Sequence, residues 1–348
     1  MVRIVGFTCS YTPLPLIHAA GFATCRILPV TKAEDQAGSM LHDNMCPHVK
    51  RVLDRALGSD LPGLEAMVFM NSCESMRRLA DVWKRTRSGD RQLLVDLPAT
   101  PGDGSVRFLS GELRRLWAAL GAPQDPGVCR KRIAASVQTH NRLVGALDGL
   151  RDEVIRRAPA GGRALLQKAF DLSVSGPPET TMSWIEEQKA SLAARPPSGS
   201  GLPVYLFGNV LPGEEAFDLL ERSGCRIVGD SLCTGTHQLR PFSIERDTDP
   251  FRAMAQDLLD RPACARTVAP ESPDRLAHFV VEQARSCGAR AVIGHVMKFC
   301  DPYLARIPAI REELSRAGLP VLVLEGDCTV RSLGQSRTRL QAFVEMLG

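Results

Sequence analysis

Three cysteines of this chain lie where a chemically active loop is expected. Cys46, Cys73 and Cys300 occur in the stretches HDNMCPHVK, MVFMNSCESM and VIGHVMKFCDPY. In the last two stretches an apolar run stops near the cysteine and a helical pattern begins just after it. In a parallel α/β sheet such a junction lies at the carboxyl end of a strand, where open sheets bind ligands. The sequence therefore predicts that thiolates gather at a ligand-binding edge.

Thiolates gathered in this way could bind a metal or act as a nucleophile. Zinc takes four protein ligands, or three and a water, and a histidine or a paired cysteine normally completes the set. Three separated thiolates with an open fourth position favour an iron–sulfur cluster instead. A nucleophilic cysteine beside His295, His42 or His48 is disfavoured, because such dyads are built by the fold and not by sequence adjacency. Three unrelated thiols at strand ends are the remaining alternative.

The elements that must position these cysteines recur in the two halves of the chain. A strand–helix–strand pattern within residues 3–30 is repeated after residue 202. A strand that ends at Cys73 has a counterpart that ends at Cys300, and a helix and a further strand follow each of them. The predicted fold class is α/β, with two doubly wound parallel-sheet domains facing a cleft and an inserted helical block.

The expected domains follow from this repeat. An N-terminal α/β domain covers residues 1–103, a helical block covers 104–198, and a C-terminal α/β domain covers 199–348. Apolar residues at three- and four-residue spacing predict the helices of the middle block. The stretch RPPSGSGLP at 195–203 is rich in helix breakers and marks the second boundary. We expect apolar faces of the helical block to pack against another subunit.

Composition narrows the possible functions. The chain has 348 residues, a net charge of +4 and 44% hydrophobic residues, which is typical of a globular protein with room for two domains. Its arginines are scattered and form no basic stripe, so we expect no nucleic-acid partner. No apolar run approaches the ~18–20 residues that span a bilayer, and the first residues lack a signal-peptide core. We therefore expect a cytoplasmic protein without a membrane partner.

The cysteine count fits the same compartment. Eleven cysteines in a reducing compartment do not indicate a disulfide framework. Four of them are expected to be ordinary buried side chains, namely Cys25, Cys225, Cys264 and Cys287. The chain also lacks both a P-loop and a dinucleotide-binding glycine motif. A nucleotide bound by this chain alone is therefore not expected.

The motifs around the cysteines are similar to those of a known family. They include the opening GFTCSYTPLPLIHAAGF, the segments NMCPHVKRVLD and NSCESMRRLADVW, and the segment GDSLCTGTHQLRPF. They continue with MKFCDPYLARIPAIREELSRAGLPVLVLEGD and end with GQSRTRLQAFVEML. Over nearly its whole length the chain resembles the iron–sulfur subunits of 2-hydroxyacyl-CoA dehydratases and benzoyl-CoA reductases, of the D-component type.

The resemblance implies a cofactor, partners and a reaction. Cys46, Cys73 and Cys300 would hold a 4Fe-4S cluster in the cleft. An ATP-hydrolysing iron–sulfur activator would inject one electron, and a ketyl radical would allow a 2-hydroxyacyl-CoA to be dehydrated to an enoyl-CoA. The partners implied are a homologous dehydratase subunit or a second copy of the chain, and the acyl-CoA substrate. The alternatives are a reductase like benzoyl-CoA reductase, a double-cubane-cluster reductase of small molecules, and a non-catalytic electron-transfer subunit.

Two departures from the family pattern stand out. Family members commonly carry an acidic residue in a first-loop pattern P-x-E-L-I, where this chain has Pro15. If that carboxylate moves a proton, the activity is altered or a partner supplies the acid. Additional cysteines, Cys9, Cys233 and Cys328, also follow expected strands and could extend the cluster site. We expect them to be buried or loop thiols.

The C-terminal segment GQSRTRLQAF offers a second possible contact with substrate. Gln335, Arg337 and Arg339 could bind the phosphates of coenzyme A. The alternative is a solvated helix face with Leu340 and Phe343 packed inward.

Overall fold

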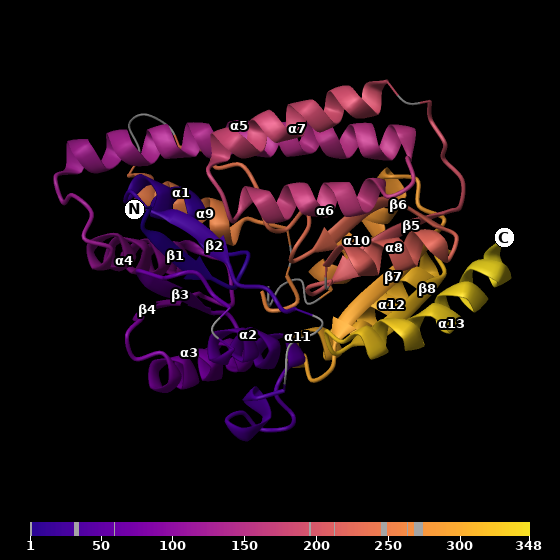
Figure 1. Ribbon diagram of the computed structural model, residues 1–348, viewed down its shortest axis with the longest axis horizontal. Coiled ribbons are helices and arrows are strands. Elements are labelled where there is room, and N and C mark those ends of the chain that lie inside the picture. Colours follow the sequence, from indigo (N-terminus) through magenta and orange to yellow (C-terminus); the bar gives the residue numbers. More distant parts are fainter. Residues whose placement is uncertain are drawn as a thin grey trace.

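The computed structural model describes residues 2–30, 35–58, 60–194, 196–211, 213–244, 249–262, 264–267 and 274–348. Within these ranges the chain forms two four-stranded sheets, both entirely parallel and covered by helices (Figure 1). The predicted α/β class with two parallel sheets is confirmed. None of the helices in these ranges is both long and apolar enough to cross a membrane.

The first sheet is built by the N-terminal part of the chain in the order β2-β1-β3-β4. Its strands are β1 (Ile4–Phe7), β2 (Ala23–Arg26), β3 (Ala66–Asn71) and β4 (Arg91–Asp96). The helical elements between and after them are α1 (Leu14–Ala19), the 3-10 turn η1 (Ala37–Ser39), α2 (Pro47–Leu57) and α3 (Glu74–Thr86). The central strand β3 is buried over nearly its whole length, as expected for a parallel strand covered on both faces.

The second sheet repeats this order as β6-β5-β7-β8. Its strands are β5 (Leu202–Gly208), β6 (Cys225–Leu232), β7 (Ala291–Met297) and β8 (Val321–Gly326). The helices of this part are α8 (Gly213–Arg222), α9 (Pro250–Leu259), α10 (Arg275–Ser286), α11 (Asp301–Leu304), α12 (Ile307–Arg316) and α13 (Val330–Leu347). The two halves are therefore built alike, as the recurring sequence pattern predicts.

The shared strand order fixes where ligands can bind. In each sheet the chain leaves the first strand toward one edge and later crosses to its other side, so the order reverses between β1 and β3, and between β5 and β7. The carboxyl ends of such neighbouring strands open a crevice that binds ligands. The loops that begin at Thr8, Ser72, Asn209 and Lys298 leave these ends.

The inserted helices run along both halves of the molecule. They are α4 (Asp103–Ala119), α5 (Pro126–Arg157), α6 (Gly162–Ser173) and α7 (Pro178–Ala193). Helices α5 and α7 pack together, and Figure 1 shows them extending over both sheets. Their apolar residues share a core with one face of the first sheet. Among the described residues, only Phe108 and Val128 are large exposed apolar side chains of this block, so the apolar face that we expected to meet another subunit is used within the chain.

The C-terminal part also reaches back to the N-terminal one. Helix α9 packs against α4, and Phe251 joins the core of the first half. At the surface of this contact Arg252 pairs with Asp103 at 2.6 Å. The chain thus crosses between the halves more than once, and this holds the two sheets in a fixed relation.

Candidate functional site

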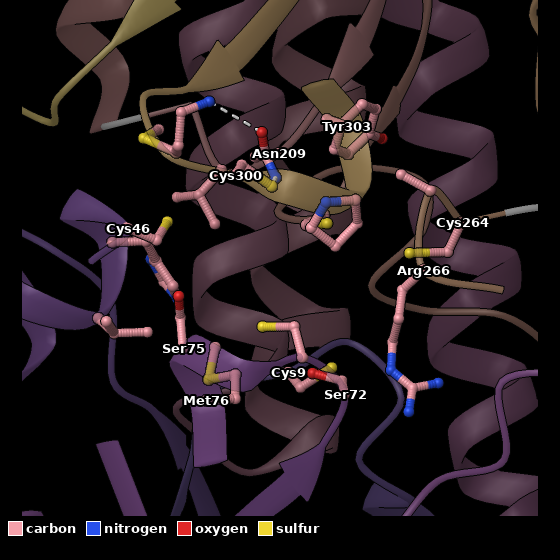
Figure 2. A pocket seen from close by; sticks show the side chains of 18 of the residues that line it. Cys9, Cys46, Ser72, Ser75, Met76, Asn209, Cys264, Arg266, Cys300 and Tyr303 are labelled. Carbon is pink, nitrogen blue, oxygen red and sulfur yellow. Dashed lines mark hydrogen bonds between the residues drawn. The ribbon is translucent and has the colours of Figure 1, made fainter. Parts of the chain in front are cut away.

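A cavity of about 500 Å³ lies where the loops from the two sheets meet. Its walls come from the loops after β1 and β3 on one side and after β5, β6 and β7 on the other. Figure 2 shows Cys9, Cys46, Cys264 and Cys300 on different sides of this space. Six cysteines line it in all: Cys9, Cys46, Cys73, Cys233, Cys264 and Cys300.

The three cysteines predicted as metal ligands share one position, immediately before a helix. Cys46 is the N-cap residue of α2, Cys73 of α3 and Cys300 of α11. None makes a side-chain capping hydrogen bond, but in each case a backbone N–H two or three residues further on lowers the pKa of the thiol. Unpaired N–H groups and the helix dipole favour negative charge at such positions. Burial has the larger effect and raises the pKa of each thiol, and the backbone N–H groups offset part of that shift.

The same three thiols lie close enough to interact electrostatically. Burial raises the pKa of Cys46, and Cys300 and Cys73 raise it further. Burial also raises the pKa of Cys73 to about 11, and Cys300 adds to this shift. The structure thus brings the three predicted residues to one cavity. Because thiols with raised pKa are poor nucleophiles, it also disfavours the cysteine-nucleophile alternative.

Sulfur ligands are spaced differently around a single metal ion and around a cluster. No group of three His, Cys, Asp or Glu side chains in the described ranges is placed to hold a single metal ion. Around one tetrahedral zinc the sulfurs would lie about 3.8 Å apart, because each Zn–S bond is about 2.3 Å. Thiolates that bind different irons of one cluster lie further apart. The thiols that line this cavity are soft sulfur donors of the kind that iron–sulfur clusters and zinc both take.

Asn209 connects β5 to the loop that carries Cys300. Its Nδ2 donates a hydrogen bond to Cys300 Sγ at 3.3 Å, and its Oδ1 accepts one from the Met297 backbone N–H at 2.9 Å (Figure 2). Its own backbone N–H donates to the His295 carbonyl at 3.0 Å. Sequence reasoning missed this residue. The sequence feature that could have identified Asn209 is its position directly after an apolar strand. Thr8 holds the same position after the first strand of the other half.

Arg266 closes the cavity on another side. Its Nη2 donates to the carbonyls of Asn71 at 2.7 Å and Leu97 at 2.6 Å, and its Nη1 donates to that of Pro98 at 3.2 Å. These carbonyls lie at the ends of β3 and β4. The arginine therefore fastens the loop that carries Cys264 to the first sheet.

The remaining cysteines are buried or lie in loops, as expected, but only some of them reach the cavity. Cys9 and Cys233 line the cavity, but Cys328 does not: it is buried, with its Sγ 3.4 Å from the Met297 sulfur. Cys264, expected from the sequence to be an ordinary buried side chain, is partly buried against the core of the first half and also lines the cavity. It lies in an irregular loop, so no strand-end pattern marks it.

Position 15, which departs from the family pattern, lies outside the cavity wall. Pro15 is buried in α1, and its carbonyl accepts a hydrogen bond from Ser136 Oγ at 2.7 Å. The carboxylates among the described lining residues are those of Glu74 and Asp301.

The C-terminal segment that the sequence links to coenzyme A lies on α13, also outside the cavity wall. Leu340 and Phe343 are buried there, as the solvated-face alternative expects. The side chains proposed for phosphate contacts are exposed, namely Gln335, Arg337 and Arg339.

The site and fold together define an α/β protein with two parallel sheets and a thiol-lined cavity between them. The chain belongs to the family of the 2-hydroxyglutaryl-CoA dehydratase D-component, whose model matches residues 9–347. This confirms the resemblance that its motifs indicate.

The chain is also similar to individual subunits of dehydratases and of a benzoyl-CoA reductase. The chain is 24% identical to the beta subunit of lactoyl-CoA dehydratase of Anaerotignum propionicum, over 99% of this chain and 91% of the relative. It is 22% identical to the (R)-phenyllactyl-CoA dehydratase beta subunit of Clostridium sporogenes, over 99% and 92%. Its identity to a benzoyl-CoA reductase subunit of Thauera aromatica is 21%, over 92% and 84%.

Proposed function

We propose that this chain is the iron–sulfur subunit of an ATP-activated 2-hydroxyacyl-CoA dehydratase. It would act within a multi-subunit system that removes water from a 2-hydroxyacyl-CoA and yields an enoyl-CoA. The observation that supports this most is the meeting of Cys46, Cys73 and Cys300 in one cavity, each at the N-cap of a helix. The family match over almost the whole chain supports the substrate class.

In this proposal Cys46, Cys73 and Cys300 hold a 4Fe-4S cluster by one thiolate each, which leaves one iron without a protein ligand. When bound, such a cluster supplies single electrons at low potential to a substrate thioester. The residues around it prepare the site. Backbone N–H groups at the three helix starts and the amide of Asn209 stabilise negative charge on sulfur.

Proton transfer has its own candidates in this chain. Position 15, where members of the family commonly carry an acid, is a buried proline outside the cavity wall. Glu74 and Asp301 do line the cavity, and each directly follows a proposed cluster ligand. We propose that one of them, or an acid from the partner subunit, serves the proton transfer that dehydration needs.

The proposed partners follow from what the chain lacks and from its relatives. The sequence has no phosphate-binding loop, so ATP hydrolysis would take place on a separate iron–sulfur activator. Two of the relatives are dehydratase beta subunits, which supports a homologous partner subunit or a second copy of this chain. Eleven free cysteines fit the reducing conditions of the cytoplasm.

An assay of the separate and combined components tests this proposal. The chain alone, with dithionite as reductant, should not turn over a 2-hydroxyacyl-CoA. Adding a partner subunit, the activator and ATP should start enoyl-CoA formation. Turnover by the single chain without them would show that the proposed division of labour is wrong.

A reductase is the second candidate function. The identity to the benzoyl-CoA reductase subunit is close to that of the dehydratase subunits, and the cavity holds more thiols than a single cluster with three ligands needs. A reductase would consume electrons in stoichiometric amounts, whereas dehydration leaves the oxidation state of the substrate–product pair unchanged. Counting electrons consumed per product distinguishes the two. A subunit that only relays electrons would show neither turnover nor binding of a thioester.

A further inference from the structure

Arg26 is a buried arginine in the cavity wall that makes no ion pair within the described part of the chain. It ends β2 and is only 4% exposed. Its Nη1 donates hydrogen bonds to the Cys233 carbonyl at 2.6 Å and to Gln238 Oε1. Both acceptors are neutral, and its Nε is buried without a hydrogen-bond partner. The bonds that hold this guanidinium therefore leave its charge uncompensated.

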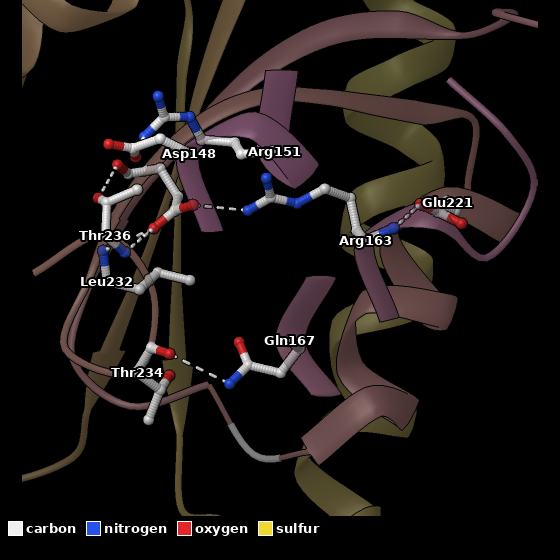
Figure 3. Close-up of polar contacts among 9 residues, drawn as sticks. Asp148, Arg151, Arg163, Gln167, Glu221, Leu232, Thr234 and Thr236 are labelled. Atoms are coloured by element: carbon white, nitrogen blue, oxygen red, sulfur yellow. Dashed lines mark hydrogen bonds and ion pairs between the residues drawn. The ribbon is translucent and has the colours of Figure 1, made fainter. Parts of the chain in front are cut away.

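Arg163 shows how the same fold treats another buried guanidinium. It is equally buried, and its Nη2 pairs with Asp230 Oδ2 at 2.6 Å (Figure 3). The carboxyl group that acts most strongly on Arg26 is that of Asp171, which accepts a hydrogen bond from Gln167 at 2.9 Å instead. Burial raises the pKa of Asp171 to about 6. Since a buried cation without a counter-charge is strongly unfavourable, Arg26 needs a negative charge that its protein neighbours do not supply.

The turn after β6 keeps this guanidinium at the cavity. Asp230 fixes the turn, because its Oδ1 accepts from the Thr236 backbone N–H at 2.9 Å and its carbonyl accepts from Thr236 Oγ1 at 2.6 Å (Figure 3). The turn presents the Cys233 carbonyl and Gln238 Oε1 to Arg26. The amide of Gln238 is itself bonded to a carbonyl of α6 at 3.0 Å. The arginine cannot turn toward solvent without breaking these bonds.

Arg26 also lies close to the proposed cluster ligands. Burial lowers the pKa of His48, and the charge of Arg26 lowers it further. The backbone N–H of His48 acts in turn on the thiol of Cys46. Arg26 acts most strongly on the thiol of Cys233, which interacts electrostatically with that of Cys300. Negative charge that arises on the thiols of this cavity therefore acts directly on the guanidinium.

We propose that Arg26 is the counter-ion of the anionic iron–sulfur cluster in this cavity, and that it links loading of the cluster to the stability of the fold. Each thiol that binds iron releases its proton, so loading places negative charge beside the guanidinium. A charge that is unfavourable in the empty chain becomes favourable in the loaded one. Because a reduced cluster is more negative, the same cation raises the midpoint potential. This inference rests on the proposed function for the cluster and adds a residue that is not one of its ligands.

The stabilisation gained on loading tests the first part of the proposal. The full chain is reconstituted anaerobically with ferrous iron and sulfide, and its thermal midpoint of unfolding is compared with that of the metal-free chain. The increase on loading should be smaller in Arg26→Gln than in wild type, and Arg26→Lys should restore most of it. Arg163→Gln is the matched control: it should be less stable in both forms, because Asp230 loses its partner, but should gain as much on loading as wild type. An equal gain in Arg26→Gln and wild type would overturn the proposal.

The midpoint potential gives a readout that a purely structural role would not change. In an EPR-monitored redox titration Arg26→Gln should shift the one-electron equilibrium about tenfold toward the oxidised cluster, which lowers the potential by about 59 mV. Arg26→Lys should stay near wild type, and Arg163→Gln should keep the wild-type value. A potential that is unchanged in Arg26→Gln, or lowered equally in Arg163→Gln, refutes the role of Arg26 as a counter-ion.

Failure of this inference is distinguishable from failure of the proposed function. A wild-type chain that takes up no iron and sulfide would refute both. A cluster that forms in wild type, with a loading gain and a potential unmoved by Arg26→Gln, refutes only the counter-ion. A cluster that responds to Arg26→Gln, in a complete system that forms no enoyl-CoA, refutes dehydration and leaves the counter-ion in place.

Discussion

Asn209 allows the electrostatics of the proposed cluster site to be tested through one side chain. Asn209→Ala removes the hydrogen bond to Cys300 Sγ and leaves the Met297 amide without its acceptor. An unsatisfied buried amide costs about 1–3 kcal/mol, so the free energy of unfolding of the metal-free chain should fall by about that amount. Thermal or urea unfolding measures this part of the effect.

The second part of the effect concerns the cluster potential. A hydrogen bond to a charged acceptor contributes about 1.5–3 kcal/mol. We take roughly a third of that, about 0.5–1 kcal/mol, as the part gained when the cluster is reduced, because one added electron is shared over the whole cluster. One tenfold change in a one-electron equilibrium is about 59 mV. Loss of the amide should therefore lower the midpoint potential by about 20–40 mV, because the reduced, more negative cluster loses more stabilisation. An EPR-monitored redox titration measures the shift.

Asn141 provides a matched control. Its Nδ2 donates to the Phe242 carbonyl at 2.8 Å and its Oδ1 accepts from the Phe242 amide at 3.0 Å, the same pair of bonds away from the cluster ligands. Asn141→Ala should lose similar stability and keep the wild-type potential. The reasoning is refuted if Asn209→Ala keeps that potential, or if the two variants shift it equally.

Two other predictions follow from burial and charge. Burial raises the pKa of Cys73 to about 11 and raises those of Cys46 and Cys300, so iron uptake must release protons and its apparent affinity should rise between about pH 6.5 and 8.5. The measurement is a titration of the metal-free chain with iron at several pH values. Uptake that does not depend on pH would contradict this prediction. The double variant Arg337→Ala, Arg339→Ala should weaken binding of a CoA thioester several-fold at low ionic strength and less at high salt, where surface charges are screened. With Arg311→Ala as an exposed control, unchanged affinity at low salt would exclude the phosphate role.

Much of the fold could be predicted because its signals are local. Buried strands alternate with amphipathic helices in both halves of the chain, and several helices end at a glycine. Cys73 and Cys300 were predictable because an apolar strand ends within three residues of each. Parallel strands place each of these ends at the ligand-binding edge of its own sheet. Cys73 and Cys300 belong to different sheets, so their meeting at one cavity depends on how the two sheets face each other.

The rest of the site depends on loop conformation, which the sequence pattern does not determine. Cys328 follows a strand as Cys300 does, yet its φ of 61° turns the backbone into the left-handed region, and its sulfur packs on Met297 outside the cavity wall. Cys264 has no strand before it and enters the cavity through a loop fastened by Arg266. The sequence also gives no sign that Arg26 is buried or that its Nε lacks a hydrogen-bond partner, since both depend on the folded structure.

The most direct test of the central claim is the iron and sulfide content and EPR spectrum of anaerobically purified wild type beside Cys46→Ser, Cys73→Ser and Cys300→Ser. Wild type should show a reducible 4Fe-4S signal. Each variant should lose or convert that signal, because thiolate is the iron ligand. Cys225→Ser, in the core of the second sheet, should retain it. If all three variants keep the wild-type signal and iron content, these cysteines do not hold the cluster.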